Sequence, residues 1–419
     1  MRRLIFIILV LSTVADVRAH GAVFTLIKKV STAQLNHILG PQRANFLPAG
    51  SRSKNYQWPK AVAARFPVAI YRVQYPSVVP EWHNKPTSAS GLIAIPIIPG
   101  THIFPVVCYQ HGTVYGKYEV PSYAFSKTNP SGFSQYSGAY ETRLMVAQYA
   151  GQGFVVEAAD YFGMGDSSLP EAYTVKGAEQ AACLGLYRAA AAFLARKDIR
   201  QSKLFLAGWS AGGLVTTAFL AKLQSVGIKV TATFTASSPN DPFAGLNCWL
   251  YHPRKHEAIW ENTLLGLTLF SYQHYDSKPG LAASVLKPKY YQAFRKIYDR
   301  DYHSQAGLAR IFNSLIKPRV PLLAYLRKPY QNPMYFADST YGKLLARSQT
   351  IRTMFLSPVR MYEGTDDEAI PVPLGKLAAC YQAAMGSRSI HLVEVPGGSH
   401  RGTFLTAVSQ SLSWFKHFE

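Results

Sequence analysis

The most constraining feature of this chain is a serine between two glycines, at a point where an apolar run meets a run of helix formers. Lys203–Ala207 reads as a strand, Gly208–Gly213 has the sequence GWSAGG, and Leu214–Leu223 reads as a helix. A serine on so sharp a turn exposes its hydroxyl above the sheet, and side chains two positions before and after it would collide there. The start of the helix also points its positive end at a reacting carbonyl group. The pattern predicts that Ser210 is a nucleophile and that the N–H of Ala211 receives the developing oxyanion.

A serine hydroxyl is inert at neutral pH, so it needs a base and an acid that orients the base. In a strand–turn–helix arrangement of this kind, the acid and then a histidine follow the serine along the chain. The strand-like run Val359–Glu363 leads into a loop with two adjacent aspartates, Asp366 and Asp367. Asp367 is favoured because Gly364 precedes it by three residues and an Ile-Pro pair follows three residues later. Asp366 stays open as the alternative.

A histidine is found in the expected third place. His400 lies in a glycine-rich loop after the strand-like run Ile390–Val395, whereas the other two downstream histidines fall within a strand and within the terminal helix. We therefore expect His400 to be the general base that takes the proton of Ser210, with Asp367 fixing its tautomer.

The second oxyanion donor is expected in the loop that follows the strand-like run Phe104–Gln110. That loop reads His111-Gly112-Thr113, and Gly112 allows the backbone to approach a ligand closely. The N–H of Thr113 is the expected donor, with that of Gly112 as the alternative. His111 is expected to anchor the loop by hydrogen bonds.

Strand-like and helical runs alternate from residue 68 onward, which predicts an α/β fold with a mostly parallel central sheet flanked by helices. The first two strands have no helix between them, so we expect them to form an antiparallel pair at the sheet edge. The expected strands are Val68–Tyr75, Gly91–Ile98, Phe104–Gln110, Phe154–Asp160, Lys203–Ala207, Val230–Ala236, Val359–Glu363 and Ile390–Val395. The clearest helices are Val175–Lys197, Ala211–Gln224 and Leu374–Met385.

The alternation stops between residues 239 and 352, where the chain is helical and rich in aromatic residues. We interpret this stretch as an inserted helical lid or cap subdomain. The catalytic domain then comprises residues 66–238 and 353–419. Residues 20–65 are expected to form a loosely structured N-terminal leader, with one possible short helix around Thr32–Leu39.

The first nineteen residues have the pattern of a secretory signal peptide. Two arginines precede the apolar run Leu4–Ala15, and Val17-Arg18-Ala19 precedes the expected cleavage after Ala19. A run of about twelve residues is too short to span the ~30 Å core of a bilayer. We therefore expect a secreted or periplasmic protein.

The chain is strongly basic, with 44 Lys and Arg against 23 Asp and Glu and a formal net charge of +21. This excess favours peripheral contact with an anionic surface. The chain has no RNP, zinc-finger or P-loop pattern, so we do not expect a nucleic-acid partner. Its cysteines could pair in three ways in an oxidising compartment, but no CxxC pair supports zinc or redox chemistry. They are Cys108, Cys183, Cys248 and Cys380.

Together these motifs resemble the α/β-hydrolase superfamily, and within it the secretory lipase and esterase group. The resemblance covers roughly residues 65–419. It rests on the helical insertion and on four motifs, Tyr109–Thr113, Asp160–Asp166, Gly208–Gly213 and Gly364–Pro371. It implies an α/β-hydrolase fold, hydrolysis of carboxylic esters through an acyl-enzyme, and a lid over the acyl site. It also implies a small-molecule or lipid ester as the substrate, with no metal and no organic cofactor.

Two other functions remain open. A serine peptidase of the prolyl oligopeptidase type shares this catalytic fold, but such enzymes usually carry a large β-propeller before it, and only residues 20–65 precede the expected domain here. A non-catalytic binding protein with a hydrolase fold typically lacks one member of the catalytic set, whereas this chain has all three.

Overall fold

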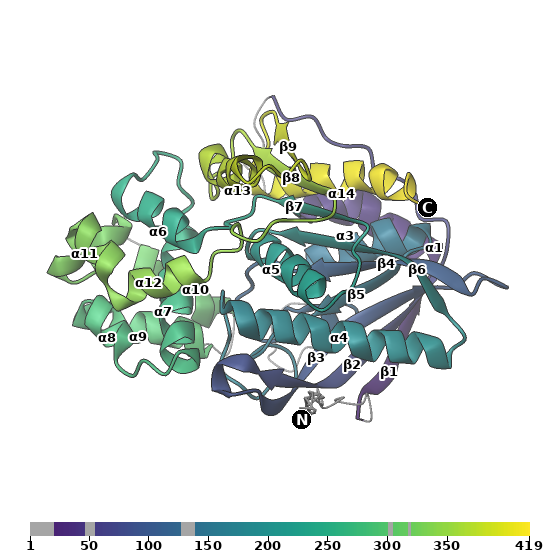
Figure 1. The fold of residues 1–419 in the computed structure, drawn as a ribbon, viewed down its shortest axis with the longest axis horizontal. Coiled ribbons are helices and arrows are strands. Elements are labelled where there is room, and N and C mark those ends of the chain that lie inside the picture. Colours follow the sequence, from purple (N-terminus) through teal and green to yellow (C-terminus); the bar gives the residue numbers. More distant parts are fainter. Residues whose placement is uncertain (1–20, 47–54, 127–138, 301–304, 317–319) are drawn as a thin grey trace, which may run out of the picture.

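The computed structural model describes residues 21–46, 55–126, 139–300, 305–316 and 320–419. These residues contain one nine-stranded sheet with the strand order β1-β2-β3-β5-β4-β6-β7-β8-β9 (Figure 1). The strands are β1 (Val23–Val30), β2 (Val68–Val79), β3 (Lys85–Pro96), β4 (Ile103–Gln110), β5 (Val155–Ala159), β6 (Arg200–Trp209), β7 (Ala232–Ala236), β8 (Val359–Gly364) and β9 (Ile390–Val395). The signal peptide expected over residues 1–19 lies outside the described residues.

Six neighbouring strands of the sheet, in the order β5-β4-β6-β7-β8-β9, pair in parallel. β3 pairs antiparallel with β5, and β2 and β1 continue the sheet with further antiparallel pairings. Each of the eight expected strands is present, and helices cover both faces of the sheet. The expected α/β architecture, a mostly parallel sheet flanked by helices, is therefore confirmed.

The prediction of a loosely structured leader is wrong for the segment that follows residue 20. β1 pairs with β2 along its length, so β1 forms the sheet edge and the β2–β3 pair lies inside it. The sequence hides this strand because its side chains do not alternate between core and solvent, and Val23 and Leu26 are both exposed. The expected short helix is present as α1 (Thr32–His37), which Ser31 caps at its N-terminus.

Each face of the sheet has its own hydrophobic layer. Along β6, Leu204 and Leu206 point into one layer, and Phe205 and Ala207 point into the other. The first layer contains α4 (Lys176–Arg196) and α5 (Ala211–Ser225), and the second contains α3 (Tyr140–Tyr149) and α14 (His400–Lys416). The sequence did not indicate α3, because that helix is buried on nearly every side and so lacks a polar stripe. The remaining α-helices that the structure describes outside the insertion are α2 (Arg43–Phe46) and α13 (Val372–Ala384).

The chain between β7 and β8 forms a group of helices at one side of the sheet, at the left of Figure 1. A buried ion pair joins this group to the sheet domain, with the Arg300 guanidinium 2.8 Å from the Glu171 carboxylate. The hydroxyls of Ser271 and Tyr298 both donate to the backbone carbonyl of Glu171. The helices are α6 (Pro242–Tyr251), α7 (Leu264–Tyr275), α8 (Leu281–Val285), α9 (Pro288–Asp299), α10 (Gln305–Ile316), α11 (Pro333–Asp338) and α12 (Thr340–Arg347).

The register of the parallel strands brings four loops to one edge of the sheet. Gln110 at the end of β4 lies beside Gly208 on β6, and Gly364 at the end of β8 lies beside Val395 on β9. Ligand sites of open parallel sheets form at this carboxyl edge. The loops that carry the candidate residues after β4, β6, β8 and β9 therefore meet there.

All four cysteines are free thiols, so none of the three possible disulfide pairings is present. Cys108 and Cys183 are buried in the same hydrophobic layer. Among the helices that the structure describes, none combines the length and the apolar character needed to cross a bilayer.

Glu157 on β5 generates a prediction about stability. Its carboxylate is buried in the sheet, accepts a hydrogen bond from the Cys108 thiol at 3.4 Å, and has a pKa that burial raises to about 8 from its ordinary value of 4.5. A carboxyl whose pKa is higher in the folded protein loses its stabilising contribution as the pH rises, here between about 4.5 and 8. Glu157→Gln should therefore raise the free energy of unfolding by about 2–4 kcal/mol at pH 8 and change it little at pH 5.

Urea unfolding at pH 5, 6.5 and 8 measures this difference. Glu394→Gln is the control, because Glu394 is half-exposed in a surface pair with Lys376. An equal gain in the free energy of unfolding at pH 5 and pH 8 would contradict a raised pKa for Glu157.

Candidate functional site

Ser210 lies on the turn between β6 and α5 with a left-handed backbone, at φ 56° and ψ −130°. Its N–H donates to the carbonyl of Ala236 on the neighbouring strand at 2.9 Å, which fixes the turn against the sheet. A Cβ atom at Gly208 would clash with Thr216 on α5, and one at Gly212 would clash with the carbonyl oxygen of Gln110. Glycine is thus required at both positions, as the sequence pattern predicts.

The structure brings His400 and Asp367 into direct contact. His400 Nδ1 lies 3.1 Å from each carboxylate oxygen of Asp367, and both side chains are buried. The backbone N–H groups of Ala369 and Ile370 donate to the Asp367 carboxylate at 2.8 Å each. Burial alone would raise the pKa of Asp367, but the charge and hydrogen bond of His400 and the N–H of Ile370 keep it below its ordinary value. Asp367 therefore stays ionised and orients the imidazole.

Asp366, the alternative acid, has no hydrogen bond to His400 among the described residues. It is exposed, and its carboxylate accepts a hydrogen bond from the neighbouring hydroxyl of Thr365 at 3.3 Å. Of the two adjacent aspartates, only Asp367 can orient His400.

Two residues that the sequence did not single out hold the backbone of His400, which is the first residue of α14. Trp209 Nε1 donates to the carbonyl of His400 at 3.0 Å, and the N–H of His400 donates to the Glu368 carboxylate at 2.9 Å. Because Trp209 directly precedes Ser210, the same turn that presents the serine also positions the histidine. Phe404 stacks on the Trp209 ring with centroids 5.1 Å apart and fixes its plane.

Ser210 and His400 line one open cleft of about 410 Å³. Thr113 lines the same cleft, so the loop after β4 reaches the candidate serine. The cleft brings together residues from the carboxyl ends of β4, β6 and β9.

The hydrogen bonds of this loop distinguish Thr113 from Gly112 as the second oxyanion donor. The N–H of Gly112 donates to the Glu141 carboxylate at 3.0 Å and is therefore engaged. Within the described residues, no acceptor is bonded to the N–H of Thr113 or to that of Ala211, the first residue of α5. The arrangement leaves the N–H groups of Thr113 and Ala211 as donors for a ligand oxygen.

Glu141 on α3 supports the same loop from behind, and no local motif pointed to it. The hydroxyl of Tyr109 donates to the carboxylate oxygen that also accepts from Gly112. Burial raises the pKa of Glu141 to about 7, against the opposing effect of these hydrogen bonds. The carboxylate therefore ties the end of β4 to the loop that follows it.

His111 anchors the loop, as expected. Its Nδ1 lies 2.8 Å from the carbonyl of Gly112, and its ring stacks on Tyr161 with centroids 4.4 Å apart. Burial lowers the pKa of His111 to about 4, so the ring is neutral at physiological pH.

Asp160, in the loop after β5, has a structural role: its hydrogen bonds connect this loop to β3 and to the segment around Ser122. Its carboxylate accepts from the hydroxyl of Ser90 at 2.6 Å and from the N–H of Ser122 at 2.9 Å. Across the described parts of the chain, no group of three or more His, Cys, Asp or Glu side chains is placed to hold a metal ion.

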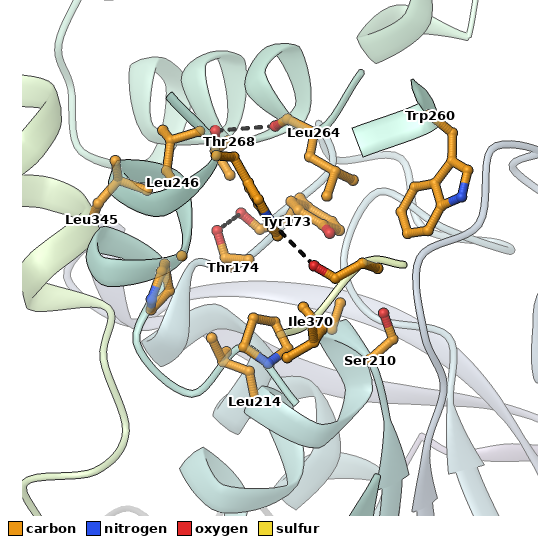
Figure 2. Close-up of a pocket in the computed structure, with 16 residues that line it drawn as sticks. Tyr173, Thr174, Ser210, Leu214, Leu246, Trp260, Leu264, Thr268, Leu345 and Ile370 are labelled. Carbon is orange, nitrogen blue, oxygen red and sulfur yellow. Dashed lines mark hydrogen bonds between the residues drawn. The ribbon is translucent and has the colours of Figure 1, made fainter. Parts of the chain in front are cut away.

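A second cavity also begins at Ser210 (Figure 2). It is narrow, with a volume of about 40 Å³, and it extends toward the inserted helices. Leu246 on α6 and Leu345 on α12 lie across it from Ser210. The candidate nucleophile thus stands where two cavities of different size meet.

Comparisons with solved structures agree with this fold. The chain is similar to a candidate hydrolase from Legionella pneumophila, at 20% identity and a TM-score of 0.76, covering 95% of this chain and 97% of that one. It is similar to the rice cell wall degrading esterase LipA from Xanthomonas oryzae at 16% identity and a TM-score of 0.73, covering 94% and 96%. It is similar to Candida antarctica lipase A at 17% identity and a TM-score of 0.61, covering 86% and 82%.

No curated protein matches the chain in a sequence comparison. A family model does match, over residues 120–409, which is more than half of the chain. The elbow that carries Ser210 and the pair formed by Asp367 and His400 lie within that range. The chain belongs to the alpha/beta hydrolase family.

Proposed function

We propose that this protein is an exported serine hydrolase that cleaves carboxylic esters through an acyl-enzyme intermediate. The observation that carries the proposal is the buried contact of Asp367 with His400, beside a cleft that His400 shares with Ser210. A serine on a strained turn, a histidine oriented by an ionised carboxylate, and two free N–H donors are the parts that acyl transfer requires.

In the first half of the reaction, Ser210 Oγ attacks the ester carbonyl carbon while His400 Nε2 takes the hydroxyl proton. The carbonyl oxygen gains a negative charge, which the N–H groups of Thr113 and Ala211 stabilise. The carbon–oxygen bond to the alcohol then breaks, and the imidazolium of His400 returns its proton to the leaving oxygen. The products of this half are the free alcohol and an acyl group on Ser210.

In the second half, His400 takes a proton from water as the water oxygen attacks the acyl carbon. Collapse of this intermediate breaks the bond to Ser210 Oγ, which takes the proton back from His400. The carboxylic acid leaves and the serine hydroxyl is restored. Asp367 stays ionised throughout and stabilises the imidazolium in both halves.

The comparisons support an ester as the substrate. Two of the proteins with the same fold are described as an esterase and a lipase. The inserted helices of this chain provide an apolar wall beside Ser210, which suits an acyl group.

Ser210→Ala tests the nucleophile. Removal of the hydroxyl should lower kcat for p-nitrophenyl butyrate by about 10⁴-fold or more, because no acyl-enzyme can form. Release of p-nitrophenol measures the rate, and circular dichroism checks that the variant is folded. Ser225→Ala, on the exposed end of α5, is the matched control and should keep full activity. Unchanged hydrolysis in the Ser210 variant would reject the mechanism.

Glu141→Ala tests whether the loop after β4 supports catalysis. Loss of the carboxylate frees the N–H of Gly112 and lets the loop move, which should misplace the Thr113 donor. We expect kcat to fall by about 10²-fold with KM changed by less than about threefold, since this donor acts mainly on the transition state. Steady-state kinetics with p-nitrophenyl butyrate measures both constants.

Glu141→Gln is the conservative partner, because its amide oxygen can still accept from Gly112. It should recover at least about tenfold of the lost kcat. If both variants lose activity only in proportion to their unfolded fraction in a thermal melt, Glu141 has a structural role alone.

A further inference from the structure

The two cavities that meet at Ser210 differ in size and in chemistry. The narrow one holds about 40 Å³ and the open cleft about 410 Å³. Among the residues that the structure describes, only Ser210 and Trp260 line both cavities, so the indole of Trp260 forms part of the wall between them. An ester bound at Ser210 must place one of its two halves in each cavity.

Among the described residues, the walls of the narrow cavity are mostly apolar. The hydroxyls at its wall are already paired: Thr268 with Tyr341 at 2.6 Å, Thr174 with the carbonyl of Tyr173 at 2.7 Å, and Tyr173 with Thr113 at 2.7 Å. The other walls are carbon, and they come largely from leucines, prolines, tryptophans and Ile370. A hydrocarbon chain fits these walls, whereas a polar group would lose its hydration there without replacement.

The narrow cavity is also short. Its volume of about 40 Å³ is about a tenth of the 410 Å³ of the open cleft, so the smaller half of an ester suits it and the larger half does not. Leu246 and Leu345 close its far side, opposite Ser210 and Trp260 (Figure 2). Leu246 and Leu345 are themselves buried against the inserted helices.

The position of His400 decides which half of the ester enters which cavity. The imidazolium must donate its proton to the leaving oxygen, so the alcohol has to lie on the His400 side of Ser210. His400 lines the open cleft and does not line the narrow cavity. The alcohol therefore enters the open cleft, and the acyl chain enters the narrow cavity.

The open cleft carries charge as well as space. Arg401 and Glu368 line it beside His400, and the Arg401 guanidinium lies 5.7 Å from the centre of the Trp209 ring. Most of the remaining lining is aromatic or apolar, including Tyr115, Trp260 and Phe312. The cleft therefore suits an alcohol that combines hydroxyl groups with carbon surface.

We propose that the substrate is an ester of a short acyl group, acetyl to butyryl, with a larger alcohol that has both hydroxyl groups and carbon surface, and that Leu246 and Leu345 set the limit on acyl length. This inference rests on the proposed serine mechanism and adds the substrate class to it.

The first experiment measures kcat/KM of the full protein for p-nitrophenyl esters from two to sixteen carbons, at concentrations below micelle formation. We expect the highest values at two to four carbons and a fall of at least about 50-fold by eight carbons, since misfit in a closed pocket costs up to about 10–200-fold per methylene. With the acyl group held as acetyl, the monoacetate of tetraethylene glycol should react within about tenfold of ethyl acetate. An optimum at eight carbons or longer would overturn the proposal.

Two variants change the cavity in opposite directions. Leu246→Ala should lengthen it and raise the rate on the six-carbon ester relative to the four-carbon ester by about tenfold. Gly245→Ala should narrow it and lower the four-carbon rate relative to the two-carbon rate by about fivefold. The added methyl group is tolerated, because the nearest atom to a Cβ at Gly245 is Leu374 Cδ2 at 3.4 Å, an ordinary contact. Leu223→Ala is the control, a buried leucine on α5 that lines neither cavity and should leave the profile unchanged.

The outcomes separate this inference from the proposed function. If no ester of any length is cleaved, the serine mechanism itself fails. If esters are cleaved but the profile of Leu246→Ala and Gly245→Ala matches that of the wild type, the assignment of the acyl cavity fails and the mechanism stands. If Leu246→Ala does not fold, the acyl-length profiles of the wild type and of Gly245→Ala still test whether the narrow cavity binds the acyl group.

Discussion

The close approach of backbones around the turn at Ser210 is the constraint on which the rest of the site depends. A Cβ at Gly212 would strike the carbonyl oxygens of both Gln110 and His111, so the backbone at the start of α5 lies directly against the backbone at the end of β4. A left-handed conformation at a non-glycine residue costs on the order of 1–3 kcal/mol, and the hydrogen bond to Ala236 and the packing of α5 hold it in place.

The second constraint is electrostatic, because the site buries several carboxyl groups close together. His400 keeps the pKa of Asp367 below its ordinary value. Glu363 lies on β8, just before the loop that carries Asp367, and its pKa is raised by burial and then by the charge of Asp367. Burial also raises the pKa of Glu141, which supports the loop after β4. Opposite shifts of neighbouring acids leave Asp367 as the charged partner of the imidazole, which is the distribution that an oriented base needs.

Much of the fold could be predicted from the sequence, because the parallel strands are short apolar runs that alternate with clear helical runs. β1 was missed since an edge strand with exposed Val23 and Leu26 carries no regular alternation, and α3 was missed since a helix buried all round has no polar face.

The site also has residues that the sequence predicted and residues that it did not. Local motifs were enough to select Ser210, Asp367 and His400 as candidates, and the structure places Asp367 and His400 in contact. Glu141 and Trp260 act across long distances in sequence, through a carboxylate behind a loop and an indole between two cavities. Contacts between residues so far apart in the sequence leave no local motif from which they could be predicted.

The most direct test of the account is the site of reaction with a fluorophosphonate probe, which modifies only a serine that a neighbouring base activates. We expect stoichiometric labelling of the folded protein, with the adduct located by mass spectrometry on Ser210, and labelling slowed by at least about 10³-fold in His400→Ala. A folded protein that remains unlabelled, or an adduct on another serine, would contradict the claim that Ser210, His400 and Asp367 act as one catalytic unit.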